Sequence, residues 1–235
     1  MSKSTKKNNI FKLEFKDNYQ IINDNCINIM EKMGKDSINF LLTDIPYDEV
    51  NRKSNGLRKL DKWNADIITF DLKKFLELVY NITENNLVIF CWIWQVSEIY
   101  NFFKSKKGTV RQLVWTKTNP SPMNWKHIYL SAIENAIWFK KPWKKFNGYC
   151  DKNYFSFSSW RSKLHPTEKN HNLLKKLILD NTDEWDIVFD PCMGSWSHWL
   201  CALELWRKFI WIELDKEYFN LSTNRLKNDG KKVSE

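Results

Sequence analysis

A chain of 235 residues is long enough for one well-buried domain and too short for two full ones. No apolar run approaches the roughly 18 residues of a membrane span, and the start MSKSTKKNN lacks the apolar core of a secretory signal. These features argue against a membrane or secreted protein, and we expect a cytoplasmic one. Five cysteines without CxxC spacing predict reduced thiols and no metal site.

The net charge of +9 is concentrated in two segments. Five basic residues against one acidic residue lie in 52–62, and seven against one lie in 140–163. Clustered positive charge suits a polyanion, because contacts to phosphate release condensed counterions. A solvated basic surface explains the charge alone equally well.

Along the chain, short apolar runs alternate with amphipathic stretches, a pattern typical of an α/β sheet with helices on both faces. Strands are predicted at 37–43, 86–91, 110–116, 132–139, 186–190 and 208–213. Helices are predicted at 26–33 (closed by Gly34), 70–81, 95–106, 171–181, 197–205 and 216–227. Segments 45–66 and 140–165 show no period, and loops of this length are usually functional. We expect a single domain over 10–235 behind a disordered basic tail at 1–9.

The first predicted strand ends in Asp44-Ile45-Pro46-Tyr47. Ligands of open α/β sheets bind at the carboxyl ends of strands. The amino group of a nucleobase is a poor nucleophile, and a carboxylate accepting one of its N–H groups would localise its lone pair, with a main-chain carbonyl accepting the other. Tyr47 would stack on a base that has left the duplex. These four residues fit an ordinary turn capped by Asp44 equally well.

A second candidate site lies near the carboxyl end of the chain. Residues 189–198 read FDPCMGSWSH and connect a predicted strand to a helix, while Glu213 ends the next predicted strand. Small residues allow close approach of the main chain, the start of the helix faces a carboxylate, and Glu213 would accept hydrogen bonds from ribose hydroxyls. The arrangement predicts a Rossmann-like site for a nucleoside cofactor.

Several motifs together carry a family resemblance. Residues 43–47 resemble the DPPY motif of N6-adenine and N4-cytosine DNA methyltransferases, with Ile45 in place of the first proline. Residues 115–122 resemble W-x-K-x-N-P-x-P, and 165–169 resemble the HPTQK loop. The catalytic motif precedes the cofactor motif, as in the circularly permuted β class. The resemblance implies a Rossmann-like methyltransferase fold with a mixed, mostly parallel sheet.

The same resemblance implies methyl transfer from S-adenosylmethionine to adenine N6 in double-stranded DNA. Cytosine N4 is the alternative, although serine is commoner than aspartate at position 44 in those enzymes. The implied catalytic residues are Asp44, Ile45, Pro46 and Tyr47. The implied cofactor residues are Asp24, His165, Pro166, Thr167, Lys169, Asp190, Pro191, Met193, Gly194, Ser195, Trp196 and Glu213.

Target recognition is expected in the 140–163 segment, where β-class enzymes place this function. The candidate DNA-binding residues are Arg52, Lys53, Arg58, Lys59, Lys144, Lys145 and Arg161, with Asn147 and Asn153 as further candidates for base contacts. A homodimer and a cognate restriction enzyme are the expected protein partners.

Tryptophan stands where family members carry glycine. This holds for Trp196 in the cofactor loop, Trp206 at a helix end, Trp185 in a turn before a strand and Trp211 beside the cofactor strand. Glycine is also expected at Trp63, Trp92, Trp125, Trp160 and Trp199. Composition agrees, since Gly is 6 where roughly 7% usage would give about 16, and Trp is 13.

Three explanations of this pattern are open. The gene uses a code in which UGA means glycine, the protein is an inactive DNA-binding relative, or the enzyme is genuinely Trp-rich with a remodelled pocket. An indole at position 196 would compete with the cofactor, because a Trp side chain has roughly 150–250 Å² of surface. We favour the first explanation, since many independent turns would otherwise need rescue.

Overall fold

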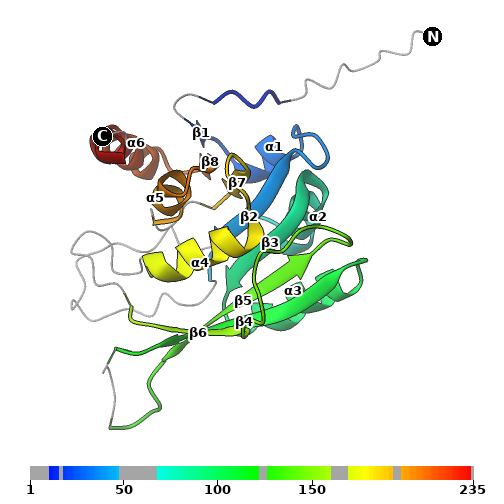
Figure 1. The fold of residues 1–235 in the computed structure, drawn as a ribbon, viewed down its shortest axis with the longest axis vertical. Helices are drawn as coiled ribbons and strands as arrows, with labels where there is room; N and C mark the ends of the chain where they lie inside the picture. Colours follow the sequence, from blue (N-terminus) through cyan, green and yellow to red (C-terminus); the bar gives the residue numbers. More distant parts are fainter. Residues whose placement is uncertain are drawn as a thin grey trace.

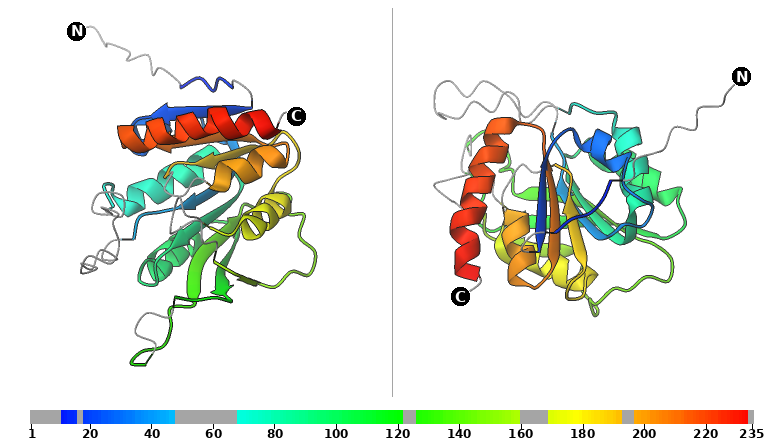
Figure 2. Two further views of the ribbon diagram at one scale, coloured as in Figure 1. Left: turned by 90° about the vertical axis from the view of Figure 1, so that its left-hand side faces the viewer. Right: turned by 90° about the horizontal axis from the view of Figure 1, so that it is seen from above.

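The computed structural model describes residues 11–15, 18–47, 68–121, 126–159, 169–192 and 197–233, which form one eight-stranded sheet with helices on both faces (Figures 1 and 2). The strands are β1 (Tyr19–Asn23), β2 (Ile38–Asp44), β3 (Thr83–Cys91), β4 (Thr109–Lys117), β5 (Ile133–Lys140), β6 (Tyr154–Phe157), β7 (Ile187–Asp190) and β8 (Lys208–Glu213). The helices are α1 (Cys26–Met30), α2 (Leu72–Ile82), α3 (Gln95–Lys104), α4 (His171–Asn181), α5 (Ser197–Glu204) and α6 (Lys216–Val233).

The strand order is β1-β8-β7-β2-β3-β5-β4-β6. Strand β5 is antiparallel to both neighbours, whereas the other described pairs are parallel. The predicted mixed, mostly parallel sheet is therefore confirmed. The parallel strands all end at one side of the sheet, which we call the carboxyl edge, and the opposite side is the amino edge.

Each face of the sheet has its own core. Leu41 of β2 packs in the cluster that includes residues of α1, α2 and α3, while its neighbours Phe40 and Leu42 pack with residues of α4 and α5. Figure 2 shows these two helical layers on either side of the sheet. Burial on both faces explains why β2 reads as an apolar run rather than an alternating one.

The helices begin at residues that cap them. The Asp71 side chain accepts a hydrogen bond from the backbone N–H of Lys74 at the start of α2, and Asn170 caps α4 by accepting from the N–H of Leu173. Such caps satisfy N–H groups that have no partner inside the helix. None of the helices in the described ranges is long and apolar enough to cross a membrane.

All six predicted strands and all six predicted helices are present, and the differences lie at edges and ends. Strands β1 and β6 were missed because they are short edge strands, YQIIN and YFSF, whose side chains stay partly exposed. The prediction that Gly34 closes α1 was wrong. The helix ends at Met30, and Glu31 caps it in an ordinary right-handed conformation.

Three tryptophans of the described ranges have a left-handed backbone. The prediction was confirmed at Trp206 (φ 61°) and for the turn at Trp185 (φ 69°), whereas Trp143 (φ 61°) was not predicted. All three side chains are exposed, so burial does not compensate the conformation. Glycine is the residue that adopts positive φ without a steric cost.

The backbone argument for glycine was wrong at Trp211. This residue lies in regular strand β8, is 2% exposed, and packs edge-on against Phe209 with ring centroids 6.2 Å apart. Trp199 is likewise buried within α5. The backbone at these two positions does not require glycine.

Candidate active site

Residues 44–47, which we call the catalytic turn, leave the carboxyl edge at the end of β2. The Ile45 N–H extends the ladder to β3 by donating to the Phe90 carbonyl, 3.2 Å away. Gln95, the first residue of α3, fixes the next position because its Nε2 donates to the Pro46 carbonyl over 3.0 Å. The turn is thereby held by two elements besides its own strand.

Both oxygens of the Asp44 carboxylate have a donor. The Tyr47 hydroxyl donates to Oδ1, and the Lys169 ammonium lies 2.6 Å from Oδ2. Lys169 comes just before α4 and is 2% exposed. The structure thus brings together two residues of the catalytic turn and a residue that the sequence assigned to a separate motif.

Lys169 also contacts a second carboxylate that sequence reasoning missed. Glu134 lies near the start of β5, with Oε2 2.8 Å from Lys169 Nζ and Oε1 2.5 Å from Lys117 Nζ. One signal was available in the sequence, since Glu134 is an acidic residue in an otherwise mostly apolar strand, IENAIWFK.

Burial and ion pairing act in opposite directions on these groups. Burial alone would lower the pKa of Lys169, but Asp44 and Glu134 raise it well above its ordinary value. Burial alone would raise the pKa of Glu134, but Lys169 and Lys117 hold it below its ordinary value. The pKa of Tyr47 is raised well above its ordinary value by burial and by the Asp44 charge. The tyrosine is therefore a hydroxyl donor and the other two groups are ionised at neutral pH.

Aromatic rings surround this ion pair. The Lys169 ammonium lies 5.0 Å from the centroid of the Phe90 ring and 5.8 Å from that of Tyr47. The Tyr47 ring in turn lies 5.6 Å from the ring of Trp92, at a tilt of 36°. The Tyr47 ring offers a stacking surface for a planar base, whereas the Trp92 ring stands at a position where glycine is expected.

Three further acidic residues stand along the carboxyl edge, and we call them the cofactor half. Asp190 ends β7, Glu213 ends β8, and Asp24 follows β1. Asn23 and Glu213 are register partners, and the Asp24 N–H donates to the Glu213 carbonyl over 3.2 Å.

Asp190 is committed to contacts inside the protein. Its Oδ1 accepts from the Thr43 hydroxyl (2.6 Å) and from the Cys192 N–H (3.0 Å), and its Oδ2 lies 2.7 Å from His198 Nδ1. It therefore ties β2, β7 and α5 together next to Pro191. The side chains of Asp190 and His198 are each only 2% exposed.

Asp24 and Glu213 form fewer side-chain contacts within the protein than Asp190 does. Asp24 Oδ1 accepts from the Asn25 N–H over 2.6 Å, and Glu213 Oε1 accepts from the Asp215 N–H over 2.8 Å. Within the described ranges neither forms a salt bridge. Burial raises the pKa of Glu213 to about 7. Two acceptors without a cation suit the hydroxyl and amino donors of an adenosine, so the residues present fit such a cofactor.

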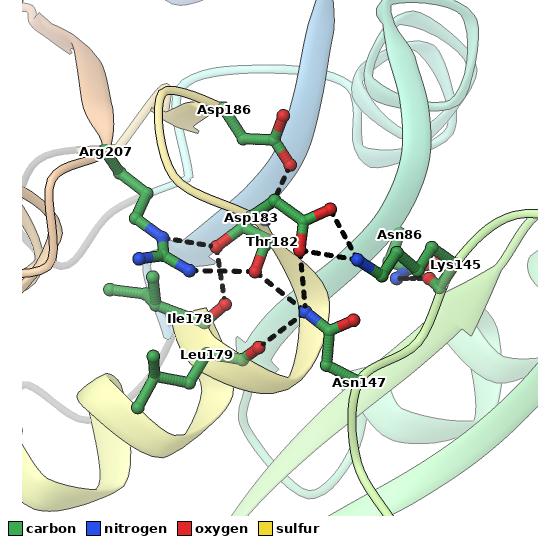
Figure 3. Close-up of polar contacts among 9 residues, drawn as sticks. All are labelled: Asn86, Lys145, Asn147, Ile178, Leu179, Thr182, Asp183, Asp186 and Arg207. Atoms are coloured by element: carbon green, nitrogen blue, oxygen red, sulfur yellow. Dashed lines mark hydrogen bonds and ion pairs between the residues drawn. The ribbon is translucent and has the colours of Figure 1, made fainter.

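Two of the candidate DNA-binding lysines lie far from this edge. Lys144 pairs with Glu84 at the start of β3 (2.9 Å), and Lys145 pairs with Asp183 after α4 (2.7 Å). Figure 3 shows Lys145 and Asn147 at this amino edge, where Asn147 donates to the Leu179 and Thr182 carbonyls. Asn153 likewise donates to the Gln112 carbonyl. The structure does not bring these lysines to Asp44.

The other predicted site residues lie outside the described residues. They are Arg52, Lys53, Arg58, Lys59, Arg161, His165, Pro166, Thr167, Met193, Gly194, Ser195 and Trp196.

Comparison with known proteins identifies the family. The model of the DNA methylase family, of the N6/N4 methyltransferase type, matches residues 38–224. The chain belongs to this family. A DNA methylase of this type has the S-adenosylmethionine-dependent Rossmann-like fold that the sequence predicted, and its substrate is DNA.

Similar proteins agree with this membership. The type II methyltransferase M2.DpnII of Streptococcus pneumoniae is 24% identical over 89% of this chain and 90% of its own length. M2.LlaDCHI of Lactococcus lactis subsp. cremoris is 25% identical over 90% of each chain.

Solved structures resemble the DNA methylase chain as well. The M1.HpyAVI–SAM complex has a TM-score of 0.67 at 29% identity, over 88% of this chain and all of that one. The cytosine-N4-specific PvuII DNA methyltransferase has a TM-score of 0.67 at 16% identity, over 87% of this chain and 85% of that one, and shares the fold.

Proposed function

We propose that this DNA methylase transfers a methyl group from S-adenosylmethionine to the N6 amino group of adenine in double-stranded DNA. The observation that carries the proposal is the Asp44 carboxylate, fixed beside Tyr47 on the same edge as Asp24 and Glu213. A base amino group and an adenosine cofactor would meet at this edge. The relatives with type II methyltransferase names support DNA as the substrate.

Each residue of the catalytic turn has a role in this reaction. Asp44 accepts one N6–H, and the Ile45 carbonyl accepts the other, so the nitrogen lone pair turns out of the ring plane. Tyr47 stacks on the extruded adenine. S-adenosylmethionine held by the cofactor half would supply an electrophilic methyl group, with its sulfonium sulfur as the leaving group. Asp44 is then the nearest described base for the proton that the nitrogen loses.

The cofactor half supplies acceptors for the adenosine part of the cofactor. We assign Glu213 to the ribose hydroxyls and Asp24 to the adenine. Asp190 positions the loop that follows it through the Cys192 N–H. The methionine part is assigned from sequence alone to 165–167 and 193–196. A cognate restriction enzyme, a homodimer and a cytoplasmic location stay predictions.

The alternative, an inactive DNA-binding relative, depends on whether the tryptophans are genuine. Trp143, Trp185 and Trp206 have positive φ with exposed side chains, which supports glycine at these codons. We therefore keep the recoding hypothesis for Trp196 and extend it to Trp143. The codons test the recoding hypothesis directly. We expect UGA at positions 143, 185, 196 and 206, and UGG at these positions would contradict the hypothesis.

Methyl transfer from labelled cofactor to unmethylated DNA, followed by nucleoside analysis, tests the function. The chain should be made with glycine at the UGA positions. We expect labelled N6-methyl-2′-deoxyadenosine. Labelled N4-methyl-2′-deoxycytidine would support the cytosine alternative, and salt-sensitive DNA binding without transfer would support the inactive relative.

A further inference from the structure

Four charged side chains form a continuous series that ends at the catalytic turn. Lys117 Nζ lies 2.5 Å from Glu134, Glu134 lies 2.8 Å from Lys169 Nζ, and Lys169 Nζ lies 2.6 Å from Asp44. The charges alternate in sign and come from β4, β5, the start of α4 and β2. We call this series the ion-pair chain. Within it, Glu134 has no part in the function proposed above.

Lys169 occupies the place that a substrate must take. Its ammonium lies against Asp44 Oδ2, while the Tyr47 hydroxyl occupies Oδ1. An incoming amino group donates to this same carboxylate, so it must share or displace one of these donors. The Lys169 side chain is only 3% exposed, so the ammonium lies largely out of contact with water. A buried cation that loses its carboxylate needs another one close by.

Glu134 meets that need without any rearrangement. It already contacts Lys169, and its side chain is 17% exposed in a strand held between β3 and β4. Its second oxygen is paired with Lys117, which keeps the carboxylate ionised. Its Oε2 forms a 2.8 Å ion pair with Lys169 Nζ but accepts no hydrogen bond among the described residues, so it can accept one when the ammonium turns from Asp44.

We propose that Glu134 is a positioning residue, which holds the Lys169 ammonium while the Asp44 carboxylate turns to the target amino group. Lys117 supports it by holding the other oxygen of Glu134. This inference rests on the proposed function of Asp44. Loss of Glu134 would leave Lys169 locked on Asp44, and the substrate would then compete with an ammonium that has nowhere else to bind.

The pH profile reports on this coupling. Lys169 faces Asp44 and Tyr47, the Phe90 ring and Cys91 of β3, and Glu134, behind which stands Lys117. Burial lowers its pKa and the two carboxylates raise it. With one carboxylate gone and burial unchanged, the pKa of Lys169 falls, so a rise in pH removes the competing ammonium sooner and should restore part of the rate in Glu134→Gln.

Glu134→Gln is the test, with Glu84→Gln as its matched control. Glu84 is also a strand glutamate paired with a lysine, Lys144, but it lies at the amino edge. We expect Glu134→Gln to lower kcat by about 10- to 100-fold, with the KM for cofactor within about threefold and a deficit that shrinks as the pH rises. Glu84→Gln should leave all three unchanged. If Glu134→Gln fails to fold, Glu134→Asp, which keeps the charge, should retain most of kcat and the pH profile.

Two kinetic results would overturn the inference. One is a wild-type kcat in Glu134→Gln, and the other is a loss of kcat that follows loss of thermal stability with the pH profile unmoved. Titration of isotope-labelled lysine side chains by NMR separates this inference from the function. If the wild-type chain transfers no methyl group, the function fails, whereas an unchanged Lys169 titration in Glu134→Gln rejects the coupling itself.

Discussion

The catalytic turn and the cofactor half share one edge of the sheet but differ in how many of their carboxylate oxygens are paired with groups of the protein. Asp44 has a donor on each oxygen, and its ion-pair chain continues through Lys169 to β5 and β4. Glu213 has no ion-pair partner among the described residues, and its pKa is raised to about 7 by burial. The turn is therefore organised before the substrate arrives, whereas Glu213, which accepts from the Asp215 N–H, gains further donors when a ligand binds.

This difference implies that the two halves fail in different ways. A change in the catalytic turn should remove chemistry and leave cofactor binding, because the cofactor carboxylates come from other strands. A change in the cofactor half should weaken binding, with smaller effects on the chemical step once the site is saturated. The predictions below test that separation.

The largest effect is expected for Asp44→Asn. The amide cannot accept the N6–H as a carboxylate does or take up the proton, and it leaves Lys169 with Glu134 alone. We expect methyl transfer in single turnovers to fall by about 10²- to 10⁴-fold. Calorimetric titration should give a cofactor Kd within a few-fold of wild type. A parallel loss of cofactor affinity would show that the two halves are coupled and would contradict the predicted separation.

Glu213→Gln should act on binding instead. We expect cofactor affinity about tenfold weaker at pH 8, because a neutral amide is the poorer acceptor for ribose hydroxyls. In the wild type, affinity should weaken as the pH falls from 8 to 6, as Glu213 takes up a proton near its pKa of about 7. Affinity that does not change with pH would argue against this role.

The same glutamate should have the opposite effect on stability. Its pKa is 4.5 in the ordinary state and about 7 in the fold, so between these values the folded state binds more protons than the unfolded one. Its contribution to stability is full below pH 4.5 and is lost as the pH rises through 7. Glu213→Gln should therefore raise Tm at pH 8 relative to wild type and lose this advantage at pH 5. Thermal unfolding at both values checks the sign.

DNA affinity should distinguish the two basic segments. Arg58→Ala should weaken DNA binding or turnover by a few-fold and should change Tm much less. Lys145→Ala should leave DNA affinity unchanged, since Lys145 pairs with Asp183 at the amino edge. Salt-dependent binding to a short duplex measures both. If Lys145→Ala weakened DNA affinity, the amino edge would be part of the DNA-binding surface.

The smallest effects concern stability at the tryptophans. Trp206→Gly should stabilise the fold by about 1 kcal/mol, because relief of a left-handed backbone outweighs the flexibility of glycine. For a chain of this size Tm should rise by about 2–4 °C. Trp138→Gly is the control. The Trp138 indole donates to Asn181 and packs on Phe146, so the Trp138→Gly variant should lose about 3–5 kcal/mol of folding stability. A lower Tm for Trp206→Gly would contradict the glycine interpretation.

Apolar periodicity was enough to predict most of the fold. Strand β2 is buried on both faces and α4 is capped by Asn170, so local pattern and tertiary packing agree. Strands β1 and β6 escaped prediction because an edge strand buries too little to require an apolar run. Their positions depend on pairing with β8 and β4, which no local window contains.

The site was predictable where one motif carried it and unpredictable where strands meet. Asp44 and Tyr47 are three residues apart, so the turn could be read directly from the sequence. Glu134 joins Lys169 across 35 residues of sequence only because β5 inserts beside β3. Clustered charge predicted DNA binding by Lys145, which forms an exposed ion pair with Asp183 at the amino edge, and its contact with DNA stays a prediction.

Cofactor affinity of the chain as written, compared with its Trp196→Gly variant, tests the account most directly. We infer that this DNA methylase needs glycine at position 196 of its cofactor loop. Calorimetric titration with S-adenosylmethionine should give weak or undetectable binding with tryptophan and clear binding with glycine. Ordinary affinity with tryptophan at position 196, or equal affinity in the two chains, would contradict it.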